Sequence, residues 1–330
     1  MPVYNAGAYL EEAIQSIIDQ TFTNFTLLLI NNGSTDNPEA IINKFNDPRI
    51  WYIKHEDNSG LIHTLNEGLN LIKSQYIIRM DADDISLPQR MEKQVAFMDA
   101  HPEIDICGTW FSILGTDQSV KHPVTNPECK IKLLQNTVFG HPTVIFRNAS
   151  ITNAKLNYDT TALYAEDYKL WADASISRLE LANIPEVLLH YRAHQGQVSV
   201  MRAVQQKQTV QNINIWYGMQ YFSEQLKDKT KLYIQFLEGS VDSFAAFSQI
   251  RVLANDLKTE NRLKNFFDRL LFDEFIDELL RAAARRIFVL CVNCDIKILW
   301  KSLSYPEFYY GTTTYQKAKF ILKSVKNTLF

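Results

Sequence analysis

The stretch YIIRMDADD, residues 76–84, joins a short apolar run to three aspartates within four positions. Residues 76–80 predict a buried strand, so Asp81, Asp83 and Asp84 come at its carboxyl end, where open α/β sheets bind ligands. The Asp-x-Asp spacing places Asp81 and Asp83 on one face of an extended segment. Asp-x-Asp alone is common in solvated turns, and only the preceding strand favours a site. Gathered carboxylates repel one another unless a cation compensates, so the stretch predicts a metal site.

Outward from this stretch, apolar runs alternate with helical patterns, which is typical of a sheet covered by helices. The expected strands are residues 25–30, 50–53, 76–80, 104–114, 144–146 and 187–191. The expected helices are residues 9–20, 40–45, 61–72, 88–100 and 167–174. We therefore predict an α/β catalytic domain over residues 1–200, with a mostly parallel, doubly wound sheet and helices on both faces.

The strand that should open such a sheet is missing from the sequence, because Met1 is followed by Pro2-Val3-Tyr4-Asn5 and then a helical pattern. Two explanations stay open: the first strand is shortened, or the true start lies upstream. The second is favoured, since a buried strand is costly to omit.

Residues 201–330 differ from the first part, because strand signals fade and helical patterns follow one another. The expected helices are residues 204–221, 231–237, 257–272, 275–292 and 315–329. We predict that this part is a helical C-terminal region appended to the α/β domain.

The composition is that of a globular protein, with 46 % hydrophobic and 22 % charged residues. Residues 1–200 carry a net charge of about −9 and residues 201–330 about +6. An acidic first part argues against nucleic acid as a partner, because phosphate contacts need clustered Lys and Arg.

Four cysteines are too sparse for a disulfide-stapled fold. With no signal-peptide pattern and no long apolar run, we expect a cytoplasmic protein.

A second acidic pair, Glu166 and Asp167, stands among aromatic residues in YAEDYKLW, residues 164–171. Acidic residues in the first turn of a helix favour the helix dipole, which is the simpler explanation of an isolated pair. Beside aromatic rings, a carboxylate can also face a sugar and gain the basicity that a general base needs. His194 follows a strand-like segment, and a lone histidine is more often packed or at the surface than a ligand.

Five stretches, in order, resemble the inverting glycosyltransferase family 2, which has the nucleotide-diphospho-sugar transferase fold called GT-A. They are MPVYN (1–5), NNGSTD (31–36), NSG (58–60) with LNEG (65–68), DADD (81–84) and AEDYKLW (165–171). Five ordered matches are far more specific than any one of them. The resemblance covers residues 1 to about 200 and leaves the helical region unmatched.

The resemblance implies how a nucleotide-diphosphate sugar would bind. Tyr4 would stack on the nucleobase, Asn32 would hydrogen-bond its edge, and Asp81 would meet the ribose. The family commonly has an acidic residue where this chain has Asn32. Because an amide offers both an acceptor and a donor, base contact is retained while the base preference stays open.

The resemblance also implies the catalytic residues. Asp83 would bind Mg²⁺ or Mn²⁺, His194 would approach the metal or the diphosphate, and Asp167 would be the catalytic base. His141 lies in a stretch that the family places near the acceptor. The full set of expected substrate-binding residues is Pro2, Tyr4, Asn32, Asn58, Gly60, Asp81, Asp83, His141 and Glu166.

The implied reaction is sugar transfer, with inversion, from a nucleotide-diphosphate sugar to a hydroxyl of a glycan or glycolipid, in polysaccharide, lipopolysaccharide or glycoconjugate synthesis. A UDP-sugar is the favoured donor. The Gln-x-x-Arg-Trp signature of processive synthases is missing, so single addition is expected.

Two other functions stay open. A nucleotidyltransferase shares a related fold and metal chemistry, but its early Gly-rich loop normally carries a Lys or Arg, which Gly33-Ser34-Thr35 lacks. A non-catalytic sugar-nucleotide-binding protein, or a decayed enzyme, is the other. The basic end of the chain, with Lys317, Lys319, Lys323 and Lys326, fits either an interfacial helix on anionic lipid or a packed helix with a solvated lysine face.

Overall fold

The computed structural model describes residues 1–194, 201–290, 317, 318 and 321. The chain divides into two compact units, Met1–Ile213 and Asn214–Phe330. The boundary falls inside one helix, α9 (Ala203–Leu226). The division at residue 200 stays a prediction.

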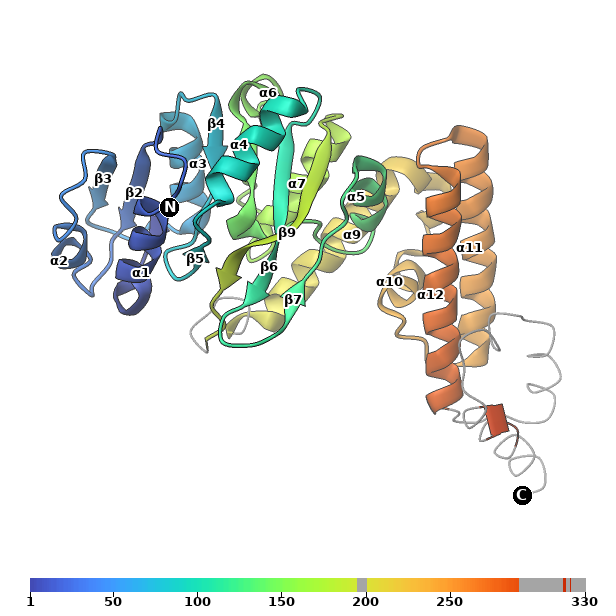
Figure 1. Cartoon of the computed structure of the whole chain (residues 1–330). Coiled ribbons are helices and arrows are strands. Elements are labelled where there is room, and N and C mark those ends of the chain that lie inside the picture. Colours follow the sequence, from blue (N-terminus) through green and yellow to red (C-terminus); the bar gives the residue numbers. More distant parts are fainter. Residues whose placement is uncertain (195–200, 291–316, 319–320, 322–330) are drawn as a thin grey trace. The chain divides into compact units, whose positions relative to one another are not determined.

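The first unit opens with a three-stranded parallel sheet in the order β1 (Pro2–Val3), β2 (Leu27–Asn32), β3 (Ile50–His55) (Figure 1). The strand β1 is two residues long, with Pro2 opposite Ile30 and Val3 opposite Asn31. The helices that alternate with these strands are α1 (Gly7–Ile18), α2 (Glu39–Ile42) and α3 (Leu61–Leu71).

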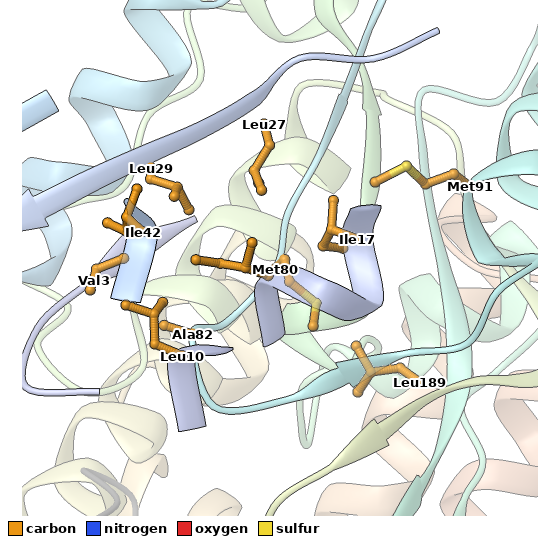
Figure 2. Close-up of a cluster of buried hydrophobic side chains, with 11 residues drawn as sticks. Val3, Leu10, Ile17, Leu27, Leu29, Ile42, Met80, Ala82, Met91 and Leu189 are labelled. Carbon is orange, nitrogen blue, oxygen red and sulfur yellow. The ribbon is translucent and has the colours of Figure 1, made fainter. Parts of the chain in front are cut away.

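Every residue of β2 is buried, as expected for a parallel strand covered on both faces. On one face, Leu27 and Leu29 belong to a core cluster with Leu10 and Ile17 of α1. Met80 and Ala82 enter the same cluster, which Figure 2 shows. The hydrophobic effect on these side chains therefore fixes the backbone of the acidic stretch, because alternate residues of it are anchored in the core.

The second sheet of this unit has the order β4 (Tyr76–Ile78), β8 (Ile145–Arg147), β6 (Ile106–Ile113), β9 (Leu181–Tyr191), β5 (Ile85–Ser86), with β7 (Ser119–Val120) beside β6. Its other elements are α4 (Arg90–Ala100), α5 (Asn126–Lys132), the short 3₁₀ helix η1 (His141–Thr143), α6 (Asn148–Asn153) and α7 (Glu166–Ile176).

The pairing of this second sheet corrects one expectation. Only β6 and β9 pair in parallel, whereas β4 with β8, β6 with β8, β6 with β7 and β5 with β9 are antiparallel. A mostly parallel sheet therefore describes the first three strands but not the second sheet. The strands β8 and β5 are antiparallel to their neighbours. Strand direction depends on tertiary pairing, which the apolar pattern of the sequence does not report. The α/β class itself, with a helical C-terminal region, is confirmed.

The second unit contains the end of α9, then α10 (Thr230–Glu238), α11 (Phe244–Lys264) and α12 (Arg269–Leu290). Aromatic rings form its core, with Phe222 and Phe267 stacked at 6.0 Å between ring centroids and Phe267 and Phe272 at 5.3 Å. No helix of the described residues is long and apolar enough to cross a membrane. Apart from Lys317, the lysines of the basic C-terminal segment lie outside the described residues.

Candidate functional site

Two aspartates of the acidic stretch, Asp81 and Asp83, are more exposed than the apolar residues next to them. Met80 and Ala82 are 3 % and 7 % exposed, while the side chains of Asp81 and Asp83 are each 27 % exposed. This alternation is the one expected of an extended Asp-x-Asp segment. Asp84 is buried completely. Each of the three aspartates offers a carboxylate oxygen, and these oxygens lie within 4.8 Å of one another.

The end of β9 holds this carboxylate cluster in place. The N–H of Arg192 donates to Asp84 Oδ1 at 2.9 Å, and its Nε donates to the Asp83 carbonyl at 2.8 Å. His194 Nε2 lies 3.0 Å from Asp83 Oδ2. The Tyr9 ring of α1 packs against His194 at 5.2 Å between centroids and under the Arg192 guanidinium at 4.7 Å. Segments 110 residues apart in the sequence thus meet at Asp83.

The cluster fits a divalent cation. Burial, followed by the charge of Asp81, raises the pKa of Asp84 to about 8. Its second oxygen, Oδ2, is buried without a hydrogen-bond partner in the described part of the chain. Carboxylate oxygens are the ligands that Mg²⁺ and Mn²⁺ prefer. Asp81, Asp83 and Asp84 are therefore the residues whose oxygens could hold such an ion, and His194 lies beside Asp83.

The first five residues of the chain form an open rim of the site. Tyr4 is 50 % exposed. Asn5 follows with a positive φ of 50°, and its side-chain oxygen accepts from the Thr35 N–H at 2.9 Å. The neighbouring Pro2 belongs to β1. Tyr4 is thus a half-exposed aromatic residue between β1 and the bonded Asn5.

Asn32 is joined to the loop before α3. Its Oδ1 accepts from the N–H and from the hydroxyl of Ser59, both at 2.9 Å. Its Nδ2 donates to Asn58 Oδ1 at 2.9 Å, and Asn58 Oδ1 also accepts from the Gly60 N–H at 2.8 Å. The Ser59 N–H can only donate, which fixes the orientation of the Asn32 amide. Asn32 is buried, and these bonds fix its amide against the loop at residues 58–60.

Glu166 and Asp167 occupy the first turn of α7, where the helix dipole favours negative charge. Burial, followed by the charge of Asp167, raises the pKa of Glu166 to about 7. Burial also raises the pKa of Asp167, opposed by the Tyr168 N–H and then by the Arg79 guanidinium. The charge of Asp81 adds a smaller contribution that also raises the pKa of Asp167.

His141 lies beside this helix, in η1. Its Nε2 is 2.8 Å from the hydroxyl of Tyr158, and its ring is 6.0 Å from that of Trp171. Burial holds the pKa of His141 well below its ordinary value. A neutral His141 and the buried Tyr158 therefore form a polar pair within the apolar surroundings of α7.

Three residues of this site were not singled out from the sequence. Arg79 forms an ion pair with Asp81, Tyr158 contacts His141, and Arg192 holds the acidic stretch. A charged residue inside the apolar run 76–80 was a usable signal for Arg79. Nothing in the spacing marks Tyr158, because its partners come from distant segments.

A cavity in the first unit is separate from this site. It has a volume of about 800 Å³ and lies between β2 and β4, lined among others by Leu28, Trp51, Ile77 and Met91. Asp99 is its one acidic lining residue, and the two acidic clusters do not line it. Lys73, Ser74 and Gln75 also line this cavity, and none of the residues expected from the sequence to bind the donor does.

Comparison with known proteins gives a consistent result. The model of glycosyl transferase family 2 matches residues 1–159. A glycosyltransferase of Haemophilus influenzae is 36 % identical over 233 residues, covering 65 % of this chain and 71 % of its own length. The amylovoran biosynthesis glycosyltransferase AmsE of Erwinia amylovora is 31 % identical over 198 residues, covering 58 % and 74 %.

Two solved structures share the fold. TarS residues 1–349 of S. aureus, in complex with UDP-GlcNAc, aligns with a TM-score of 0.58 at 18 % identity, covering 98 % of this chain and 87 % of that one. The mannosyltransferase PcManGT of Pyrobaculum calidifontis, in complex with GDP-Man and Mn²⁺, aligns with a TM-score of 0.51 at 15 % identity, covering 99 % and 85 %.

Proposed function

The chain belongs to glycosyl transferase family 2, and on that premise we propose that it transfers a sugar, with inversion, from a nucleotide-diphosphate donor to an acceptor hydroxyl. The observation that supports the proposal is the aspartate cluster after β4, where oxygens of Asp81, Asp83 and Asp84 lie within 4.8 Å of one another and His194 Nε2 lies 3.0 Å from Asp83.

Asp167 is the proposed base. It takes the proton of the acceptor hydroxyl as that oxygen bonds to the anomeric carbon, while the bond from this carbon to the diphosphate oxygen breaks. One in-line displacement inverts the anomeric configuration. The pKa of Asp167, raised by burial, makes its carboxylate a stronger proton acceptor than an exposed aspartate.

The leaving diphosphate gains negative charge, and a bound Mg²⁺ or Mn²⁺ would supply Lewis-acid stabilisation of that charge. Asp83 and His194, 3.0 Å apart, would hold the ion. Arg192 keeps Asp83 in position through the bond to its carbonyl. The solved relative bound to Mn²⁺ supports this proposal.

The donor would bind along the rim formed by β1, β2 and the loop before α3. Tyr4 offers a ring face to the nucleobase, and Asn32, oriented by Asn58, would hydrogen-bond its edge. Pro2 in β1 and Gly60 before α3 would also contact the donor, and Asp81 would receive the ribose. UDP-GlcNAc in one solved relative supports a UDP-sugar as the favoured donor.

The acceptor would approach from the side of α7. Glu166, beside the base, and His141, bonded to Tyr158, are the proposed acceptor-side residues. AmsE is named for amylovoran biosynthesis, which supports a glycan or glycolipid acceptor in polysaccharide synthesis.

The test is a thermal-shift screen of nucleotide sugars with and without Mn²⁺, followed by product detection with the donors that bind. Ligand binding to the folded state raises the melting temperature. We expect a Mn²⁺-dependent rise for wild type, none for Asp83→Ala, and an undiminished rise for Asp167→Asn.

Transfer should be lost in Asp167→Asn and retained in Asp173→Asn, a control on the same helix whose carboxylate pairs with Lys169. Loss of a general base costs about 10²–10⁴-fold in rate. Near-normal transfer by Asp167→Asn would exclude it as the base. Donor binding without turnover in wild type would favour the non-catalytic alternative.

A further inference from the structure

The Tyr9 side chain projects from a helix that is fixed by its apolar residues. Tyr9 lies in the first turn of α1, and its N–H donates to the Ala6 carbonyl at 2.9 Å. Leu10, Ile14 and Ile17 of the same helix are buried in the core cluster. Because the burial of these three side chains holds α1 in place, the position of the Tyr9 ring is set by the fold itself.

One face of α1 is turned toward the strands β5 and β9. Tyr9, Glu12 and Ser16 follow one another at spacings of three and four residues, which places them on one side of the helix. Ser16 Oγ accepts from the Ser86 N–H at 3.1 Å, and the Glu12 carboxylate forms an ion pair with Arg192. This face of α1 therefore packs against segments that flank the aspartate cluster.

The Tyr9 ring contacts two side chains of the segment that follows β9. The Arg192 guanidinium lies over the ring, 4.7 Å from its centroid. The centroid of the His194 ring is 5.2 Å away, with 37° between the two ring planes. A cation over a ring face and a second ring beside it are both favourable contacts of an aromatic side chain. One ring thus supports both residues.

Both supported side chains continue to Asp83. Arg192 Nε donates to the Asp83 carbonyl at 2.8 Å, and His194 Nε2 lies 3.0 Å from Asp83 Oδ2. The first contact fixes the main chain of Asp83, and the second fixes the direction of its carboxylate. The side chains of Arg192 and His194 are 19 % and 25 % exposed, so both have room to turn toward solvent once the ring is removed.

We infer that Tyr9 is a positioning residue of the proposed metal site: its ring holds Arg192 and His194 against Asp83, so that the carboxylate is in place before the ion binds. The inference rests on the proposed role of Asp83 in holding Mg²⁺ or Mn²⁺. Tyr9 acts through these two side chains and does not itself contact the ion. Replacing a residue that orients metal ligands in this way weakens metal binding by about 10–100-fold.

The experiment titrates the protein with MnCl₂, first alone and then with UDP present, and measures free Mn²⁺ by electron paramagnetic resonance. The place of binding is read from NMR spectra of histidine-labelled protein, because paramagnetic Mn²⁺ broadens the signals of nearby imidazoles. The His194 signal is identified by its absence from His194→Gln. For wild type we expect saturable binding with a broadened His194 signal, and for Asp83→Ala the loss of both.

Tyr9→Leu removes the ring and should bind Mn²⁺ about 10-fold more weakly than wild type, because Arg192 and His194 lose their common support. Tyr9→Phe retains the ring and should bind Mn²⁺ as wild type does. Phe97→Leu is the matched control, since Phe97 of α4 is also partly buried and its ring lies 4.4 Å from that of His101, which is not a proposed site residue. This control should have the Mn²⁺ affinity of wild type.

Equal Mn²⁺ affinities of wild type and Tyr9→Leu would overturn the inference. So would an equal weakening in Tyr9→Phe or in Phe97→Leu, because the ring at residue 9 would then not be the cause. If Tyr9→Leu does not fold, Tyr9→Met decides, since methionine also favours a helix and has no ring. A wild-type protein that binds no Mn²⁺ beside His194 would instead contradict the proposed metal site, and the inference with it.

Discussion

Buried carboxyl groups set the chemistry of this molecule at the residue scale. Asp84 and Glu166 are almost fully enclosed, and burial raises the pKa of both. Each therefore exchanges a proton nearer to neutral pH than an exposed acid does. Ionising these buried carboxyl groups therefore destabilises the folded protein, and a cation or a bound substrate could offset that cost.

Glu166→Gln should raise the free energy of unfolding at neutral pH, because the variant has no buried carboxylate at this position. The folded-state pKa is about 7 and the ordinary value is 4.5, so wild type loses stability as pH rises through that interval. The glutamine variant should be more stable above pH 7 by at most about 3 kcal/mol, and equal to wild type well below pH 4.5. Urea unfolding at several pH values measures this difference.

Glu56→Gln is the control, because the Glu56 side chain is 85 % exposed. Its stability difference from wild type should not grow between pH 4.5 and 7. A Glu166→Gln curve parallel to that of the control would show that Glu166 is not held in a strained environment.

Individual site residues were predictable to different degrees. The acidic stretch was found because an apolar run precedes it, and its alternation follows from strand geometry. Tyr158 and Arg192 were not singled out, since their partners lie 17 and about 110 residues away. Local patterns report the neighbours of a residue along the chain and do not report contacts made by tertiary packing.

At the scale of elements, turns position the residues proposed to bind the donor along β1, β2 and the loop before α3. Gly33 has φ of +70°, and a Cβ there would lie 2.5 Å from the Asp57 carbonyl carbon and 2.6 Å from the Asn58 nitrogen. Only glycine adopts this conformation at this approach without strain. The close passage of residues 57–58 is what brings Asn58 to Asn32.

Gly33→Ala should therefore cost more stability than Gly115→Ala. Both positions have a positive φ, which costs an alanine about 1–2 kcal/mol, but nothing lies within 4 Å of a Cβ at Gly115. The additional loss at Gly33, measured by urea unfolding, reports the backbone clash. Equal losses would indicate that the loop at residues 57–58 moves freely away from β2.

Helix boundaries show where pattern reading was wrong. Residues 257–272 were expected to form one helix, but α11 ends at Lys264 and α12 begins at Arg269. Asn265 adopts φ of +55°, and the Asn261 side chain accepts from the Phe267 N–H at 2.9 Å. Apolar residues continue through this turn because Phe267 is buried, so the helical pattern does not reveal the break.

For the whole molecule, fold class and family could be read from the sequence, whereas strand direction could not. Five ordered motifs predict the family, and the family model matches residues 1–159, which contain the first four of these motifs. The antiparallel pairing of β4 with β8 and of β5 with β9 depends on which segments meet after long excursions of the chain. The division into two units is likewise a property of three-dimensional contacts.

We propose that Asp83, His194 and Asp167 serve one donor site. The most direct test is anomalous diffraction from crystals soaked with MnCl₂ and UDP. We expect a manganese peak bound by Asp83 with His194 beside it, the uracil on Tyr4, and Asp167 facing the diphosphate side of the same pocket. A peak remote from Asp83, or UDP in the cavity between β2 and β4, would contradict it.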